Sequence, residues 1–203
     1  MNKFITFEGV EGSGKSTQTK MLKEYFEVQK IPAILTREPG GTKVAEEIRE
    51  ILVKGNVDKM DGICEALLNF AARRNHIEKL IKPALKKGEI VICDRFFDST
   101  IAYQSFGQNV DLKAIQNIQK IAIADFSPDI TFLIDIDIEV SFERIKLRED
   151  NNRYEKMDRN FHQKVRDGFL QIAGDNLKRM VIIDGNQSAE KIHQEILSRI
   201  KSN

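Results

Sequence analysis

The sequence predicts an α/β fold built on a five-stranded parallel sheet, with helices on both faces. The first observation is a set of five short apolar runs, partly β-branched, at 4–7, 33–36, 90–93, 130–134 and 181–183. Most of these runs are nearly continuous, as in strands buried on both faces, whereas half-exposed strands alternate apolar and polar residues. The second observation is that helical patterns separate the runs, and this alternation is typical of a three-layer parallel-sheet architecture.

The first three predicted strands are connected by helical patterns. Apolar residues recur three or four positions apart, which places them on one face of a helix. These patterns cover 21–26, 44–52 and 63–85.

The second half of the chain repeats this alternation. Further helical patterns cover 112–124, 142–147, 161–173 and 189–200. They flank the fourth and fifth predicted strands, and no internal repeat or low-complexity linker interrupts them. A chain of 203 residues therefore suits one domain, 1–203, with a substantial core.

Charge and cysteine usage exclude several partners. The formal net charge is +1, so there is no global reason to expect a nucleic acid or a membrane as a partner. Cys64 and Cys93 lack the spacing of a metal or redox motif, which favours free thiols in a reducing cytoplasm. An anion site, if present, must be local.

A glycine-rich stretch follows the first predicted strand and precedes the first predicted helix. Gly9–Ser16 fits the pattern GxxxxGK[ST] in the strand–helix context that this motif requires. Its backbone N–H groups would cradle phosphate oxygens, Lys15 would reach the β- and γ-phosphates, and Ser16 would ligate Mg²⁺. The residues expected to bind the nucleotide phosphates are Gly9, Val10, Glu11, Gly12, Ser13, Gly14, Lys15, Ser16 and Thr17. This motif predicts a P-loop NTPase fold, but leaves open GTPases, ATPases and small-molecule kinases.

Charged residues also lie at the carboxyl ends of the second and third predicted strands, where open α/β sheets bind ligands. Arg37 follows the second strand and could grip a phosphate with its guanidinium fork. Asp94 and Arg95 follow the third strand. Asp94 could hold the Mg²⁺ shell, and Arg95 would face the same crevice.

A polar, strongly basic segment runs from Arg144 to Arg166. We expect a lid at about 144–160 that carries cations to the transferring phosphoryl group and excludes water. A solvated helix face with salt bridges would have the same composition, so composition alone does not separate the two interpretations.

Four motifs together resemble thymidylate kinase, in its bacterial form. They are EGSGKST at 11–17, TREPGGT at 36–42, DR at 94–95 and DSTIAYQ at 98–104. The resemblance covers the chain from Phe4 to about Gln187. It implies an enzyme that transfers the γ-phosphoryl group of ATP to dTMP with Mg²⁺, giving dTDP and ADP on the route to dTTP. It also implies a homodimer.

The resemblance assigns the catalytic cations. Some members of the family carry an arginine directly after the acid at the Glu11 position, but Gly12 stands there in this chain. The missing charge is then expected from the basic segment, with Arg148 and Arg153 as candidates beside Lys15 and Arg95. Glu11 itself would lie near the dTMP sugar.

The resemblance also assigns the dTMP site. Arg37 and Arg95 match the residues that hold the 5′-phosphate, and Thr100 and Gln104 match positions that line the thymine pocket. Arg144 matches the position that packs on adenine.

The thymine contact on the helical pattern 63–85 remains open between neighbours. Arg73 matches the family's thymine-binding arginine, and Asn69 occupies the place of its stacking phenylalanine. We expect Phe70 to stack on the base and Arg73 to contact it. The alternatives are that Arg74 makes this contact, one helical turn from Phe70, or that Phe70 belongs to the core.

Two other functions compete with this interpretation. Another nucleotide or nucleoside kinase would share the P-loop, although arginines at 37 and 95 favour a monophosphate as the acceptor. A P-loop switch protein would need no acceptor, but the chain lacks the guanine-reading NKxD motif.

Overall fold

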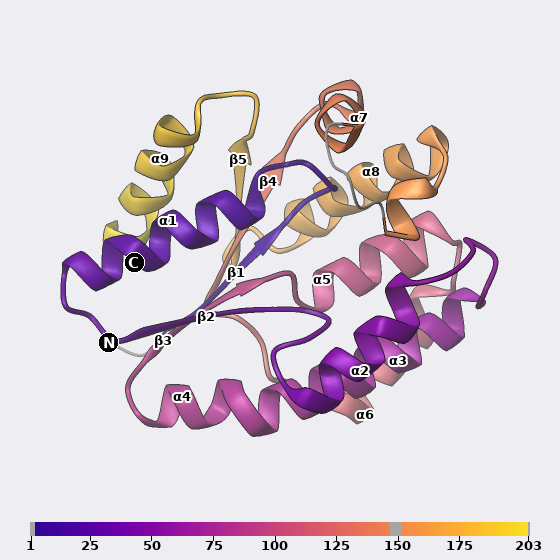
Figure 1. Cartoon of the computed structure of the whole chain (residues 1–203), viewed down its shortest axis with the longest axis horizontal. Coiled ribbons are helices and arrows are strands. Elements are labelled where there is room, and N and C mark those ends of the chain that lie inside the picture. Colours follow the sequence, from indigo (N-terminus) through magenta and orange to yellow (C-terminus); the bar gives the residue numbers. More distant parts are fainter. Residues whose placement is uncertain (1–2, 147–151, 203) are drawn as a thin grey trace.

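The computed structural model describes residues 3–146 and 152–202, and its centre is a five-stranded sheet (Figure 1). The strands are β1 (Phe4–Glu8), β2 (Ala33–Arg37), β3 (Ile90–Asp94), β4 (Ile130–Asp135) and β5 (Met180–Asp184). They are all parallel and lie in the order β2-β3-β1-β4-β5. The predicted fold class is confirmed.

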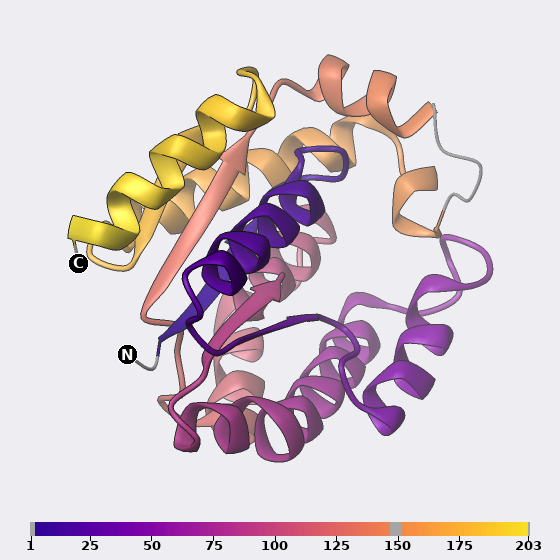
Figure 2. The same ribbon diagram turned by 60° about the vertical axis from the view of Figure 1, so that its left-hand side comes forward.

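Helices cover both faces of this sheet (Figures 1 and 2). In chain order the helical segments are α1 (Lys15–Val28), α2 (Lys43–Val53), α3 (Gly62–His76), η1 (Ile77–Ile81), α4 (Lys82–Lys86), α5 (Phe97–Thr100), η2 (Ile101–Gly107), α6 (Leu112–Ile123), α7 (Ile138–Lys146), η3 (Tyr154–Lys156), α8 (Arg159–Asp175) and α9 (Ala189–Ser202). Several begin at a side-chain cap: Asp61 accepts from the N–H of Cys64, and Asp158 accepts from that of Phe161.

Alternate residues of each inner strand pack into two different hydrophobic cores, one on each face of the sheet. Ile5 and Phe7 of β1 pack with α1 and α9 on one face, while Phe4 packs with α3, α4 and α6 on the other. Successive strand side chains point to opposite faces, so a strand buried on both faces needs apolar residues at successive positions. This requirement is the physical origin of the continuous apolar runs in the sequence.

One pair of helical segments was not expected from the sequence. Residues 97–107 form the short α5 and then the π-helix η2, which packs against α8. The stretch mixes β-branched, aromatic and polar residues without a clear helical period, so its sequence pattern is weak. Its structure depends on packing between segments that are distant in the chain.

The carboxyl ends of β1, β2 and β3 meet at one edge of the sheet. Asp94 lies opposite both Phe7 of β1 and Arg37 of β2 in the strand register. The loop from β1 to α1 opens at this same edge (Figure 2). The sheet therefore brings the glycine-rich motif and the charged strand ends together.

Candidate active site

The loop between β1 and α1 has a backbone that only glycine fits at its first position. Gly9 has φ +139°, and a Cβ atom there would lie 2.5 Å from the backbone oxygen of Ile134. Gly14, also at positive φ, caps the N-terminus of α1, so the first N–H groups of the helix face the loop. The geometry is that of an anion cradle at a helix N-terminus.

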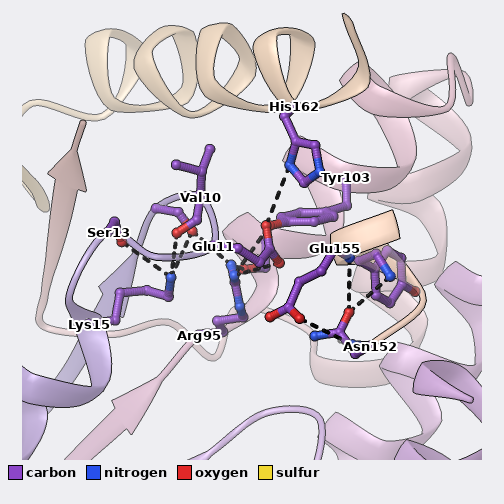
Figure 3. Close-up of polar contacts among 12 residues, drawn as sticks. Val10, Glu11, Ser13, Lys15, Arg95, Tyr103, Asn152, Glu155 and His162 are labelled. Carbon is purple, nitrogen blue, oxygen red and sulfur yellow. Dashed lines mark hydrogen bonds and ion pairs between the residues drawn. The ribbon is translucent and has the colours of Figure 1, made fainter. Parts of the chain in front are cut away.

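Lys15 folds over this loop. Its Nζ donates to the backbone oxygens of Gly9 at 3.0 Å and Val10 at 2.8 Å, and to Oγ of Ser13 at 3.3 Å (Figure 3). Burial and the positive charge of Arg95 lower the pKa of Lys15 to about 8, although nearby carboxylates act in the opposite direction. The ammonium group is therefore held at the loop by neutral acceptors.

Ser16 and Asp94, the two residues predicted to hold Mg²⁺, lie within hydrogen-bond distance of each other at the rim of the loop. The Ser16 hydroxyl donates to Oδ2 of Asp94 at 2.7 Å. Both are hard oxygen donors, which Mg²⁺ prefers. No cluster of three or more His, Cys, Asp or Glu suited to a metal ion occurs within residues 3–146 and 152–202.

Two adjoining cavities open beside the loop. The polar cavity, of about 210 Å³, lies against the loop and the strand ends, while the inner cavity extends toward α3 and η2. The residues lining both cavities are Glu11, Glu38, Arg49, Arg95 and Asn152. The two cavities therefore form one site with arginines at the junction.

Arg95 is the central cation of this junction. It has φ +71°, and its guanidinium donates to Gly9 O, Ser99 Oγ, Glu11 Oε1 and the hydroxyl of Tyr103. The surrounding network fixes the guanidinium at the boundary between the two cavities.

Arg37 and Arg49 add positive charge at the same place. Arg37 lines the polar cavity and pairs with Glu46 at 3.2 Å. Arg49 lines both cavities and donates to Pro39 O at 3.0 Å. Sequence analysis missed Arg49, although its spacing from Ala45 and Leu52, which are buried, placed it on the inward face of α2.

The carboxylate of Glu11 lies at the junction and accepts hydrogen bonds from two side chains. Arg95 and the hydroxyl of Tyr103 donate to its carboxylate, and Nδ1 of the buried His162 lies 3.7 Å away (Figure 3). Burial alone would raise the pKa of Glu11, but the charges of Arg95 and Lys15 outweigh burial and lower it. Tyr103 and His162 were not assigned roles from the sequence; only the tertiary structure brings them to Glu11.

The inner cavity includes two predicted residues and excludes a third. Thr100 and Gln104 line it. Phe70 does not: its side chain is only 1% exposed and belongs to the core between α3, α6 and the sheet. The wall position is taken by Asn69 instead. The expectation that Phe70 stacks on a base is corrected, because the orientation of α3 about its axis directs the Phe70 ring into the core.

The two neighbouring arginines of α3 lie in different environments. Arg73 is buried behind the inner cavity, where it donates to Glu38 Oε2 at 2.6 Å and to Thr100 Oγ1 at 3.1 Å. Arg74 points away from the cavity, pairs with Glu78 and donates to Ala122 O. The alternative that assigned a ligand contact to Arg74 is therefore corrected, whereas direct contact by Arg73 stays a prediction.

The basic segment contributes to the site with residues other than those expected. Asn152 and Tyr154 line the inner cavity, and Glu155 lines the polar one. Arg153 is fully buried in an ion pair with Glu65 and donates to the backbone oxygens of Leu52 and Val57. Its expected place over the phosphates is thus corrected for this structure. Arg148 lies outside the described residues.

Arg144 lies on the other side of the loop. It donates to Gly12 O at 3.0 Å and lines a third cavity together with Gly14, Gly185 and Gln187. Gly12, Ser13 and Gly14 of the loop line this cavity, so it adjoins the phosphate cradle.

Comparisons with known proteins agree on one family. A family profile described as thymidylate kinase matches residues 7–196. The chain is 48% identical to a thymidylate kinase of Wolbachia pipientis wMel over 97% of its length and 99% of the relative's. It is 43% identical to one of Sulfurihydrogenibium sp. (strain YO3AOP1), over 99% and 98% of the two chains.

A solved structure gives the same result for the fold. The crystal structure of thymidylate kinase from Ehrlichia chaffeensis superposes with a TM-score of 0.79 at 40% identity, covering 98% of each chain. In the described part of this chain, no helix has the length and apolar character needed to cross a membrane.

Proposed function

The chain belongs to the thymidylate kinase family and phosphorylates dTMP, and we propose that the phosphoryl donor is ATP bound with Mg²⁺ in the β1–α1 loop. The observation that carries this proposal is the junction of the two cavities. The polar cavity beside the phosphate cradle adjoins the inner cavity, and Arg49 and Arg95 line both. A donor and an acceptor phosphate can therefore meet there in line.

We assign the triphosphate to the loop and the adenine to the cavity beside Arg144. Lys15 would exchange its contacts with Gly9 and Val10 for the β- and γ-phosphates. Arg144 would pack on the adenine ring, since it lines the cavity next to Gly185. Ser16 and Asp94 fit Mg²⁺ by their donor chemistry. When bound, this ion neutralises charge on the phosphates.

The dTMP phosphate would bind at the arginine junction. Arg95 and Arg49 line both cavities, and Arg37 faces the polar one. Guanidinium forks suit a dianionic phosphate. The acceptor is already an anion, so transfer needs positioning and charge stabilisation rather than a strong general base. Glu11 would hold Arg95 and lie beside the sugar.

We further propose that residues 1–203 act as one kinase domain in which 144–160 serves as the lid. Asn152 and Glu155, which line the polar cavity, support this role for the segment. Arg148 remains the proposed transition-state cation of the lid. Arg153 would instead anchor the segment, because its guanidinium pairs with Glu65.

We propose a homodimer that pairs through α3 and α6. The exposed apolar residues Ile63, Leu67 and Ile121 support this, since they lie on these two helices. Light scattering would test it: Leu67→Glu should give monomers, whereas Val28→Glu on α1 should not.

We assign the reaction to the cytoplasm, where the free thiols of Cys64 and Cys93 would stay reduced.

An ADP-release assay tests the reaction directly. ATP, Mg²⁺ and each of dTMP, dUMP, dCMP, dGMP, UMP and AMP would be supplied to the wild-type enzyme and to Lys15→Ala. We expect turnover led by dTMP and reduced by several orders of magnitude in the variant. Near-normal turnover by Lys15→Ala would overturn the assignment of the donor to the loop. Equal turnover with another monophosphate would overturn the thymine assignment of the inner cavity.

A further inference from the structure

Glu65 is a buried carboxylate that the reaction described above does not use. It lies on α3 with no measurable exposure, and its partners come from segments far apart in the chain. Oε2 accepts from Gln104 Nε2 at 2.8 Å, from Gln108 Nε2 at 2.9 Å and from the hydroxyl of Tyr154 at 2.9 Å. Oε1 pairs with the guanidinium of Arg153 at 2.6 Å.

Such a group is not explained by stability alone. Replacing a buried ion pair with apolar residues of similar volume is often neutral or stabilising. A carboxylate that contacts four donors therefore also fixes the positions of the side chains that donate to it. One of its donors, Gln104, lines the inner cavity, and Tyr154 lines it as well. Glu65 thus positions two side chains that line the cavity assigned to the base.

The contact determines which end of the Gln104 amide faces the cavity. An ionised carboxylate only accepts hydrogen bonds, so Gln104 must direct its NH₂ group toward Glu65. Its Oε1 is then the end left for a ligand. A flipped amide would place Oε1 against the carboxylate and lose the hydrogen bond. Arg153 supplies the positive charge that a buried carboxylate needs.

We propose that Glu65 is a positioning residue that sets base specificity by fixing Gln104 as a hydrogen-bond acceptor. This inference rests on the assignment of the inner cavity to the base. Thymine and uracil carry an N3–H donor, which an amide oxygen can accept. Cytosine carries a bare N3 acceptor, and two facing acceptors in a desolvated site repel each other. The site therefore selects pyrimidines with N3–H.

The expected discrimination follows from the strength of the contact that holds the amide. To bind cytosine, Gln104 would have to flip and give up a hydrogen bond to a charged group. Such bonds correspond to roughly 10- to 150-fold in affinity. We expect the wild-type enzyme to bind dTMP about 10- to 150-fold more tightly than 5-methyl-dCMP, which retains the methyl group and differs only at the N3–C4 edge.

The test compares these two nucleotides by titration calorimetry without ATP, so it does not depend on turnover. Glu65→Gln makes the neighbour of Gln104 an amide, which can donate as well as accept. We expect the preference for dTMP to narrow at least tenfold, through tighter binding of 5-methyl-dCMP. The double variant Glu65→Gln/Arg153→Met removes the unpaired guanidinium and should narrow it equally. If the single variant folds poorly, the calorimetric comparison uses this double variant instead.

Gln108→Met is the matched control. Gln108 donates to the same carboxylate oxygen but does not line the inner cavity, so this variant should keep the wild-type preference. Equal losses for both nucleotides in the Glu65 variants, with the preference within twofold of wild type, would show a merely structural role and overturn the proposal. A narrowed preference in Gln108→Met would overturn it too. Failure of the wild-type enzyme to bind dTMP would instead refute the base assignment.

Discussion

Replacing Arg73 by methionine should destabilise the protein by removing the charge that balances Glu38. The two side chains form an ion pair at 2.6 Å, and each is only 2% exposed. Methionine keeps most of the aliphatic stem but leaves a buried carboxylate with His76 as its remaining side-chain partner, at 2.9 Å. Breaking a buried pair from one side costs about 3–5 kcal/mol. Loss of the hydrogen bonds to Thr100 and Phe96 acts in the same direction.

The assay is urea unfolding at fixed protein concentration, with no nucleotide present, because ligands stabilise the folded state. For a chain of this size, 1 kcal/mol corresponds to about 2–4 °C in Tm, so a thermal scan should show a fall of about 6–20 °C. Arg74→Met is the matched control. Arg74 is the next residue and is also paired, but its side chain is 54% exposed, so its loss should cost less than about 1 kcal/mol.

A double-mutant cycle separates the pair from its surroundings. Arg73→Met with Glu38→Gln removes both charges, and we expect it to lose far less than the sum of the two single variants. Additive losses would show that the two groups are not coupled. A fall of less than about 1 kcal/mol in the free energy of unfolding of Arg73→Met alone would likewise refute the reasoning, because a buried carboxylate without its counter-charge should destabilise the protein by more than that.

Three further outcomes are expected at the nucleotide sites. Arg49→Ala should raise KM for dTMP about 10- to 100-fold and leave KM for ATP unchanged, because Arg49 stands at the cavity junction; steady-state kinetics that show equal shifts would contradict this. Arg144→Ala should show the reverse, with KM for ATP raised about tenfold, while the exposed Arg199→Ala changes neither constant. The pKa of Lys15 is lowered to about 8, and the triphosphate prefers the protonated form. ATP affinity should thus fall as the pH rises from about 7 through 8, whereas calorimetry of Lys15→Met should show weak affinity without this decline.

Much of the fold could be predicted because its signals are local. Each inner strand must supply apolar residues to two cores, and this need is visible as a nearly continuous apolar run such as 130–134, which only Thr131 interrupts. The loop at Gly9 demands positive φ and tolerates no Cβ, so its glycines are visible as well. The meeting of Ser16 with Asp94 followed from the rule that parallel strands end at one edge.

The walls of the site could not be predicted in this way. Whether Asn69 or Phe70 faces the cavity depends on a rotation of α3 by one residue, about 100°, which packing against α6 and the sheet determines. The position of Arg153 depends on a carboxylate 88 residues earlier in the chain, at Glu65. A basic segment looks the same in sequence whether its arginines face a phosphate or a buried partner.

By itself, the sequence determined the parallel sheet, the phosphate loop and the family to which the chain belongs, because these depend on backbone conformation, on periodicity and on motifs of adjacent residues. Only the tertiary structure decided that Arg49 lines both cavities, that Phe70 belongs to the core and that Gln104 donates to Glu65. The physical reason is that buried charges and amide orientations are set by partners brought together in space, and the energy of each contact depends on burial that no single stretch of sequence encodes.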